Sequence, residues 1–447
     1  MPPLELRDRP PTPVSESSRH LERVVSRHVG IVRVVDEVLA EASDIRLANL
    51  FCETGWLEPV VGRPTTHLGA GSAAERSAAR AAAIGEAVER YSACASDVVD
   101  AVVASAAELG PETVNPCRFA LFADEQYADS DFRYARFDER TPVAWVEGFS
   151  LPDGEPALLP AQLVYLGWRL RPGETPIFFS TSSGLACHVT VEEALATGLL
   201  ELIERDAFMI TWRARLSHPR LTWAAGSRLG RFVGEFVAPT GVSVAAIDLS
   251  AFWNVPCVLG VARAAATDDA PLGVGAAAAA SIERAVEKAF DEAIRVRSWA
   301  RSMRAQDAEA FRLSAEDVRT FEDHIRFHSD AENAGAAAFL DASRETVAIS
   351  GVPSLEGTTA AAHVLAICAR LQARGMTAYA VDVTSTDVAD AGLRVLRAVV
   401  PELSPLDVDH RYRALGGRRL YEEPARLGLR PRALTFVELN PDPHPFP

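Results

Sequence analysis

Residues 198–212 of the chain read GLLELIERDAFMITW, a helical segment with acids inside an apolar run. A helix that is apolar on nearly all sides lies buried in a protein core. At about 100° per residue, Glu201 and Glu204 lie roughly 60° apart with Arg205 beside them, so one face carries two carboxylates and a guanidinium. Buried carboxylates require cations. The segment therefore predicts a buried acidic site on a long helix over Val191–Arg215.

A second helix, expected over Glu75–Ala95, repeats the same E-x-x-E-R pattern. Its residues 84–91 read IGEAVERY and carry Glu86, Glu89 and Arg90. The alternative interpretation is a pair of exposed i,i+4 ion pairs, each contributing only about 0.3–0.5 kcal/mol. If the two helices instead pack face to face, four carboxylates meet two arginines. Divalent cations with oxygen ligands would balance that charge, and Mg²⁺ usually binds together with substrate phosphates.

The third acid–base segment begins at Lys288, the only lysine in the chain, and reaches Glu292 one turn later. It lies on a helix expected over Ser281–Met303. A GC-rich coding bias explains the shortage of lysine, and the surviving residue is a candidate contact for phosphate. The sequence has no GxxxxGK[ST] loop, which disfavours a standard P-loop enzyme. The GxG at Gly273–Gly275 is expected to be a close-packing site rather than a dinucleotide loop.

Composition excludes several classes of protein. The 447 residues include 45 Lys+Arg and 61 Asp+Glu, for a formal charge of −16, which argues against nucleic acid or an anionic membrane as the main partner. The six cysteines form no CxxC pair and are expected to be reduced. No secretion signal is visible, and no apolar run approaches the roughly 18 residues of a membrane span. The expected location is cytoplasmic.

The pattern of elements predicts an α+β, or mixed α/β, fold. Residues 1–20 are expected to be loosely attached, and a helical pattern is expected over Leu21–Ala40. Buried strands are expected at Val242–Asp248 and Pro256–Ala262, and a helix at Asp387–Val399. The domain division is an amino-terminal extension with a flexible start at 1–54, followed by one composite catalytic domain at 55–447.

Four motifs, in this order, give the chain its resemblance to a known family. They are the Gly-Ala-Gly of residues 69–71 with ARAAAIGEAVERYS at 79–92, SSGLACHVTVEEAL with GLLELIERDA at 182–207, EKAFDEA at 287–293, and the closing PHPFP at 443–447. Together they resemble the YcaO family, and most closely its azoline-forming cyclodehydratases, the D proteins. The resemblance covers roughly residues 55–447, and the proline-rich end marks this subgroup.

The resemblance implies a YcaO-like fold with mixed sheets and long helices that converge on a cleft for ATP and Mg²⁺. By motif match, glutamates hold the magnesium ions against the triphosphate. The residues that match the metal ligands are Glu86, Glu89, Glu201 and Glu204. The residues assigned to the nucleotide site are Glu193, Arg205, Lys288, Glu292 and Arg90.

Two positions depart from the family pattern. Ala70 and Ser72 stand where a lysine is common between glycines, and His188-Val189 stands where the family has Gly-Asn. Both changes remove polar groups expected near the nucleotide, which puts the details of ATP contact in doubt. The adjacent Cys187 and His188 are expected to be structural rather than a catalytic dyad, because neighbours on an extended segment point to opposite faces.

The activity implied by the resemblance is an ATP-dependent cyclodehydration of a ribosomally made precursor peptide. A Cys, Ser or Thr side chain attacks the preceding amide, whose oxygen is phosphorylated and lost, leaving a thiazoline or oxazoline. The terminal carboxylate of Pro447 is the candidate base; the alternative is a frayed tail. Implied partners are the precursor peptide and a separate leader-binding protein, with a flavin-dependent azoline oxidase and a homodimer also compatible. Two other outcomes stay open: thioamide or amidine formation, and a catalytically degenerate scaffold.

Overall fold

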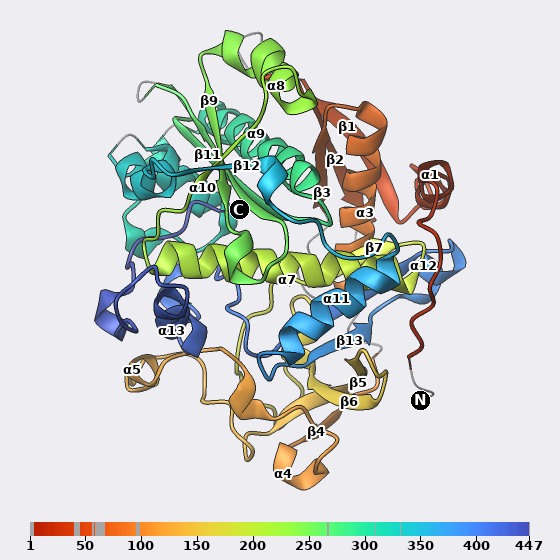
Figure 1. Ribbon diagram of the computed structural model, residues 1–447. Helices are drawn as coiled ribbons and strands as arrows, with labels where there is room; N and C mark the ends of the chain where they lie inside the picture. Colours follow the sequence, from red (N-terminus) through yellow and green to blue (C-terminus); the bar gives the residue numbers. More distant parts are fainter. Residues whose placement is uncertain are drawn as a thin grey trace.

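A computed structural model of the chain describes residues 4–39, 45–55, 58, 68–94, 99–265, 268–307, 309–330 and 332–446. In this part of the chain, three β-sheets are separated and covered by long helices (Figure 1). The expected α+β class is confirmed. No helix among the described residues is both long and apolar enough to cross a membrane.

The first sheet is antiparallel and consists of β1 (Val32–Val38), β2 (Ala48–Thr54) and β3 (Leu68–Ala73). Helix α3 (Arg76–Cys94) forms within the predicted range of 75–95 and packs directly on β3. A Cβ added at Gly69 would lie 2.4 Å from the amide nitrogen of Ala87, and one at Gly71 would lie 2.3 Å from the carbonyl oxygen of Ala79. Both glycines therefore let the helix approach the strand backbone.

The helix expected over residues 21–40 is wrong. Helix α1 (Val14–Arg23) ends early in that range, and β1 follows. The segment VRVVDEV is rich in valine, whose β-branched side chain favours a pleated strand. Pairing with β2 supplies its main-chain hydrogen bonds. Strands β2 and β3 lie on either side of residue 55 in the sequence and pair with each other. The domain boundary after residue 54 stays a prediction.

The amino-terminal segment is also more firmly held than expected. The amide of Leu4 donates to the carbonyl of Gly154 at 3.1 Å, and that of Arg7 donates to Glu192 Oε1 at 2.8 Å. The Arg23 side chain reaches the carbonyl of Ala391 at 3.2 Å. A loosely attached start is therefore wrong for residues 4–23, which run along the molecule beside α7 (Val191–Arg213) and α12 (Thr386–Asp390) (Figure 1).

The second sheet has the order β11-β10-β9-β8-β12. Its strands are β8 (Arg220–Thr222), β9 (Ser243–Asp248), β10 (Cys257–Arg263), β11 (Leu272–Ala278) and β12 (Thr346–Ala348). Helix α9 (Ile282–Gln306) covers β10 and β11. A Cβ at Gly275 would lie 2.6 Å from the amide nitrogen of Ala293, so the GxG of β11 is the close-packing site that the sequence predicts.

The third sheet has the order β4-β5-β13-β14-β7, with β6 paired to β5. Its strands are β4 (Val102–Ala104), β5 (Val143–Leu151), β6 (Pro156–Pro160), β7 (Leu185–His188), β13 (Ala378–Asp382) and β14 (Arg394–Val399). The helix expected over 387–399 is wrong: α12 covers only Thr386–Asp390, and β14 is an inner strand. Short apolar runs do not distinguish a buried strand from a buried helix.

Helix α7 (Val191–Arg213) crosses the centre of the molecule and contacts β7 and β14 on one side and β10 and β11 on the other (Figure 1). Thr190 caps it by accepting from the amide of Glu193, as predicted. The other α-helices described are α4 (Ala106–Leu109), α5 (Asp124–Tyr127), α6 (Ala161–Val164), α8 (Arg228–Phe232), α10 (Phe321–Ser329), α11 (Ala360–Gln372) and α13 (Arg418–Arg426). Helix α7 thus lies between the second and third sheets and contacts both.

Candidate active site

Three helices bring five glutamates into one acidic cluster, consisting of Glu86 and Glu89 of α3, Glu201 and Glu204 of α7, and Glu292 of α9. The pKa of Glu89 is raised well above its ordinary value by burial and by the nearby charges of Glu201 and Glu86. Burial likewise raises the pKa of Glu204 to about 7, opposed by Arg205 and reinforced by Glu292 and Glu201. The expected convergence of the α3 and α7 acids is therefore present, and α9 adds to it.

In four of these glutamates, the Oε2 atom of the carboxylate accepts a hydrogen bond from a main-chain amide. The donors to Oε2 are Ala70 for Glu86 at 2.5 Å, Gly184 for Glu201 at 3.1 Å, Ala278 for Glu204 at 3.1 Å and Ala276 for Glu292 at 2.9 Å. Three of the four amides belong to strands β3 and β11, and the fourth precedes β7. The backbone of the sheets thus fixes where each carboxylate points.

The other oxygen of the same four acids faces an arginine on its own helix. Arg90 lies 2.6 Å from Glu86, Arg205 lies 3.2 Å from Glu201 and 2.9 Å from Glu204, and Arg295 lies 3.3 Å from Glu292. The i,i+4 pairs of the alternative interpretation do form, but the Arg205 side chain is only 13% exposed. The pairs of Arg205 therefore lie within the molecule, whereas Arg90 and Glu86 are each 27% exposed and form a half-buried pair.

Glu89 is the exception in the cluster. Among the described residues it has neither a hydrogen bond nor an ion pair, and only the more distant charges of Arg90 and Arg397 favour its ionised form. No three His, Cys, Asp or Glu side chains in the described ranges are already placed around a common metal position. The donor set is nevertheless entirely oxygen and carries more acid than the arginines balance. Both properties fit a hard divalent cation such as Mg²⁺.

Glu193 lies two turns before Glu201 and faces the amino-terminal segment. It accepts hydrogen bonds from the amide and hydroxyl of Thr12 at 2.7 and 2.8 Å, and from the hydroxyl of Thr190 at 2.9 Å. Burial opposes its ionisation, but these hydrogen bonds and His188 hold its pKa below the ordinary value. The contact of Thr12 with this acid was not predicted, because the two residues are 181 positions apart in the chain.

Lys288 lies on α9, four residues before Glu292 of the acidic cluster. Its charge acts on both Glu204 and His188. The residue is exposed, and its amino group has no hydrogen bond or ion pair among the described residues. His188 bonds to the hydroxyl of Thr197 at 2.9 Å, and burial raises the pKa of the Cys187 thiol, so these neighbours do not form a catalytic dyad.

One cation of the site was not anticipated. Arg397, on β14, is only 7% exposed, and its charge acts on Glu201 and Glu89. It donates to the carbonyl of Thr181 at 2.7 Å and to the hydroxyl of Ser180 at 3.0 Å. Burial lowers its pKa to about 10. Arg397 was missed because residues 387–399 were predicted to form a helix. In a strand, Arg394 and Arg397 lie on opposite faces, so a strand prediction would have placed one of the two toward the interior.

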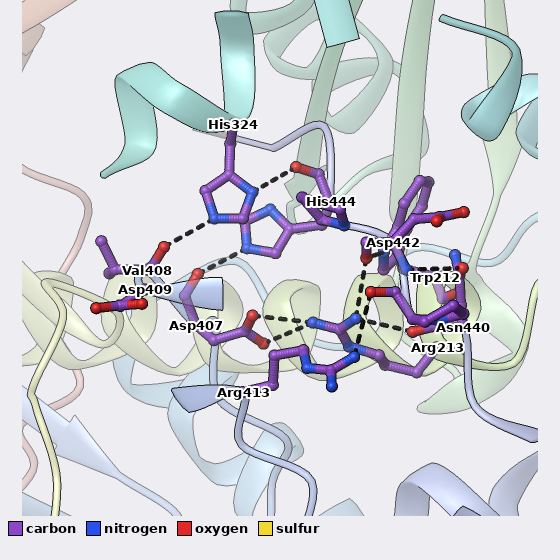
Figure 2. A network of polar contacts seen from close by, with 12 residues as sticks. Trp212, Arg213, His324, Asp407, Val408, Asp409, Arg413, Asn440, Asp442 and His444 are labelled. Atoms are coloured by element: carbon purple, nitrogen blue, oxygen red, sulfur yellow. Dashed lines mark hydrogen bonds and ion pairs between the residues drawn. The ribbon is translucent and has the colours of Figure 1, made fainter. Parts of the chain in front are cut away.

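The carboxyl-terminal tail, residues 437–446 of the described chain, is held against α7 and α10 by hydrogen bonds (Figure 2). Trp212 Nε1 donates to the carbonyl of Asp442 at 3.0 Å, and Arg213 pairs bidentately with Asp407 at 2.9 and 3.1 Å while donating to the carbonyl of Asn440 at 3.0 Å. Both members of the Arg213–Asp407 pair are fully buried. The tail is thus hydrogen-bonded to the arginine of a buried ion pair.

Histidines complete the attachment of the tail. The rings of His324 and His444 stack with centroids 3.9 Å apart, and His324 Nδ1 lies 2.8 Å from the carbonyl oxygen of His444 (Figure 2). His328 Nε2 donates to the carbonyl of Pro443 at 2.7 Å. The last described residue, Phe446, is fully buried against Phe208. Pro447, the candidate base, lies outside the described residues.

The family comparison agrees with this geometry. A family model described as YcaO cyclodehydratase, ATP- and Mg²⁺-binding, matches residues 70–404. The chain belongs to the YcaO family. Among curated proteins, it is 30% identical over 244 residues to an uncharacterized protein of Methanothermobacter thermautotrophicus, covering 53% of this chain and 60% of that one. It is 29% identical over 187 residues to an uncharacterized protein in the tfuA 3′ region of Rhizobium leguminosarum bv. trifolii, covering 40% and 44%.

Solved structures share the fold. A heterocyclase in complex with substrate and cofactor has a TM-score of 0.80 at 23% identity, covering 100% of this chain and 59% of that one. The heterocyclase TruD has a TM-score of 0.70 at 22% identity, covering 100% and 56%. YcaO from Methanopyrus kandleri, bound with AMPPCP and Mg²⁺, has a TM-score of 0.62 at 20% identity, covering 90% and 94%. The chain therefore spans about three fifths or less of the curated relatives and of the two heterocyclases.

Proposed function

We propose that the protein is an ATP- and Mg²⁺-dependent cyclodehydratase that converts Cys, Ser or Thr residues of a ribosomally made peptide into thiazolines or oxazolines. One observation carries the proposal. Five carboxylates from three helices lie close enough for their charges to act on one another, four of them are positioned by main-chain amides, and Glu89 among the described residues lacks a paired cation. A structural core does not concentrate acid in this way, because like charges in a buried site destabilise it.

The described side chains divide into two roles. Glu86, Glu89, Glu201 and Glu204 would hold Mg²⁺, which when bound neutralises charge on the transferring phosphoryl group. Exposed Lys288 is available to a phosphate oxygen as a point charge. The nucleotide site would include Glu193, Glu292, Arg90, Arg205 and Lys288. The cluster thus supplies both signs of charge that a bound nucleotide requires.

The reaction balances with ATP as cosubstrate. The side-chain sulfur or oxygen bonds to the carbonyl carbon of the preceding residue, its proton leaves to a base, and the C=O π pair moves onto the oxygen. That oxygen takes the terminal phosphoryl group of ATP, which releases ADP. Breakage of the C–O bond then releases phosphate, and loss of the amide proton forms the C=N bond. The products are azoline, ADP and phosphate.

The carboxyl-terminal tail forms part of the environment of the proposed reaction site. The Arg205 guanidinium lies 4.1 Å over the Phe446 ring, and the same arginine pairs with Glu201 and Glu204. The described end of the tail therefore lies beside the acids, where an aromatic ring excludes water and strengthens electrostatic interactions. The carboxylate of Pro447 as the proton acceptor stays a prediction.

Partners are inferred from the same set of relatives. One solved relative is a heterocyclase in complex with substrate, and another is the E. coli microcin synthetase McbBCD complex with pro-MccB17 bound. We infer that this chain, too, acts on a precursor peptide with the help of a separate leader-binding protein. A flavin-dependent azoline oxidase and a homodimer are compatible with this assignment.

The function is tested by co-expression with candidate precursor peptides rich in Cys, Ser and Thr, and with candidate leader-binding proteins, sought among the genes that neighbour this one. Mass spectrometry of the peptide should show loss of one water per ring. Glu201→Gln, which keeps size and removes charge, should abolish that loss and weaken Mg²⁺-dependent binding of AMPPCP. A gain in mass from replacement of amide oxygen by sulfur would instead indicate thioamide formation. No change of mass, with no ADP released, would indicate a scaffold.

A further inference from the structure

One residue of the amino-terminal segment, Thr12, donates to both oxygens of the Glu193 carboxylate. Its main-chain amide donates to Oε1 at 2.7 Å, and its hydroxyl donates to Oε2 at 2.8 Å. Oε2 also accepts from the hydroxyl of Thr190 at 2.9 Å. Because each oxygen has its own donor, the carboxylate cannot turn about its axis without losing a hydrogen bond. Thr12 therefore fixes the orientation of Glu193.

The charge of Glu193 is held differently from that of the other acids assigned to the site. Four carboxylates of the acidic cluster each pair with an arginine, namely those of Glu86, Glu201, Glu204 and Glu292. Glu193 has no ion pair within the described part of the chain, and its donors are the neutral amide and hydroxyl groups of two threonines. Its orientation therefore depends on these threonines and not on a cation.

The same hydrogen bonds keep Glu193 ionised. Burial raises the pKa of this carboxyl, but the donors of Thr12 and Thr190 and the nearby ring of His188 outweigh burial and hold the pKa below its ordinary value. His188 ends β7, and the charge of Lys288 on α9 acts on it in turn. An ionised carboxylate only accepts hydrogen bonds, so Thr12 also fixes what Glu193 can bind.

Glu193 retains room for a further donor. A carboxylate has about four acceptor positions, and three donors of the described residues occupy it. The residue is half-buried, whereas the adjacent Glu192 is only 6% exposed and accepts from the amide of Arg7 at 2.8 Å. Glu192 therefore serves to hold the amino-terminal segment, and Glu193 is the acid of the pair that a ligand can still reach.

The hydrogen-bond donors of a nucleotide lie in its nucleoside part. Ribose hydroxyls and the amino group of adenine can donate, whereas phosphate oxygens are acceptors and carry charge of the same sign as Glu193. A hydrogen bond to an ionised acceptor is roughly twice as strong as one between neutral groups. It is also directional, so it requires a carboxylate that is both ionised and correctly oriented. The two hydrogen bonds from Thr12 meet both requirements.

We propose that Thr12 is a positioning residue of the nucleotide site, and that it holds the Glu193 carboxylate in the orientation in which this acid accepts a hydrogen bond from the nucleoside part of ATP. The inference rests on the proposed function, which assigns Glu193 to the nucleotide site. It adds a residue that lies 181 positions away in the sequence. The amino-terminal segment thereby becomes part of the site, with a role beyond covering the surface.

Calorimetric titration of the full chain with AMPPCP in the presence of Mg²⁺ tests the proposal. Thr12→Val, which keeps the shape and removes the hydroxyl, should weaken binding by about tenfold, the factor that corresponds to one hydrogen bond to a charged group. Thr12→Ser, which keeps the hydroxyl, should bind as tightly as the unmodified protein. Glu193→Gln should weaken binding at least as much as Thr12→Val. Addition of Thr12→Val to Glu193→Gln should cause no further loss, because both changes remove the same contact.

The matched control is Glu192→Gln, the same substitution at the adjacent acid that also binds the amino-terminal segment. It should leave AMPPCP affinity unchanged. An equal loss of affinity in Glu192→Gln and Thr12→Val would mean that Thr12 only holds the segment in place, which would overturn the proposal. Tighter AMPPCP binding in Thr12→Val would make Thr12 a competitor of the nucleotide and would overturn it as well.

The same titrations separate this inference from the proposed function. If Glu201→Gln abolishes Mg²⁺-dependent binding and Glu193→Gln weakens it, but Thr12→Val has no effect, the positioning role of Thr12 is wrong and the proposed function stands. If Glu193→Gln leaves the affinity unchanged, Glu193 does not contact the nucleotide and the inference is wrong. If the unmodified protein does not bind AMPPCP with Mg²⁺ at all, both fail together.

Discussion

The guanidinium of Arg205 lies 4.1 Å from the centroid of the Phe446 ring and joins the carboxyl-terminal tail to the acidic cluster. The same ring packs against Phe208 with centroids 4.9 Å apart. A buried cation–π contact contributes about 2 kcal/mol. One aromatic residue therefore shields an arginine that pairs with two of the proposed metal ligands, so the tail and the acidic cluster form a single structural unit.

Phe446→Ala should lower the free energy of unfolding by about 3–5 kcal/mol, since it leaves a cavity beside Phe208 in addition to removing the ring contact with Arg205. Urea denaturation followed by circular dichroism measures the change. Val437→Ala, at a tail valine that is 87% exposed, is the control and should alter stability by less than about 0.5 kcal/mol. Equal effects of both substitutions would mean that the end of the tail is not packed as described.

Asp407→Asn should destabilise the protein by about 3–5 kcal/mol, because it leaves the Arg213 guanidinium buried without its counter-charge. Asp409→Asn removes a partner of Arg411 from a more exposed pair and should cost no more than about 1 kcal/mol. Chemical denaturation compares the two variants. Limited proteolysis should also cut the tail sooner in Asp407→Asn. A similar stability for both variants would contradict the buried attachment of the tail.

The histidines that hold the tail predict acid sensitivity. Burial lowers the pKa of His328 to about 3, from an ordinary value of 6.5. Between these values the unfolded chain binds a proton that the folded chain does not, so stability falls as the pH falls from about 6.5 toward 3. His328→Gln, whose amide can still donate to the carbonyl of Pro443, should reduce the loss of stability between pH 7 and pH 5.5 by about 1 kcal/mol.

Urea unfolding at the two pH values measures this difference, and the same substitution at exposed His28 is its control. His218 and His410, whose pKa values burial lowers to about 4 and about 3, should add to the acid sensitivity of the unmodified protein. A His328→Gln variant with an undiminished pH dependence would show that this histidine is accessible to protons in the folded state.

Glu89→Gln should stabilise the protein in the absence of metal, by up to about 1 kcal/mol, because it removes one of several crowded carboxylates. The same variant should gain less stability than the unmodified protein on addition of Mg²⁺ and AMPPCP, since ligand binding to the folded state raises stability in proportion to affinity. Thermal unfolding with and without these ligands measures both effects. Glu283→Gln, at an exposed position of α9, should change neither.

The long helices were predictable because their local signals agree. Thr190 caps α7 and the apolar run around Glu201 buries it, so both the range and the acidic face follow from spacing. The glycines of β11 likewise indicated close packing. The two wrong helices lie at β1 and β14. The valines of β1 favour a strand locally, and its partner β2 is the next strand along the chain, so β1 could have been predicted. Strand β14 instead pairs on one side with β7, which lies far earlier in the sequence, and local propensity cannot supply that information.

The site was predictable to the extent that it lies on those helices. Glu86, Glu89, Glu201, Glu204 and Glu292 come together as expected, whereas the amides that position them belong to strand backbones and leave no trace in side-chain identity. Arg397 reaches the cluster from β14, and Thr12 reaches Glu193 across 181 residues. Such contacts result from chain topology, which residue spacing does not reveal.

The amides that hold Glu86 and Glu292 belong to the main chain, so these hydrogen bonds do not depend on which side chains the strand residues carry. Any residue except proline presents an N–H at the position of Ala70 or Ala276, so replacement of either side chain leaves the carboxylate anchor in place. Ala70 can therefore stand where the family resemblance predicts a lysine without disturbing the hydrogen bond to Glu86. Because Ala70 is half-buried and Ala276 is only 5% exposed, the strand of Ala70 has more room to change its side chain than β11, while both keep their carboxylate anchor.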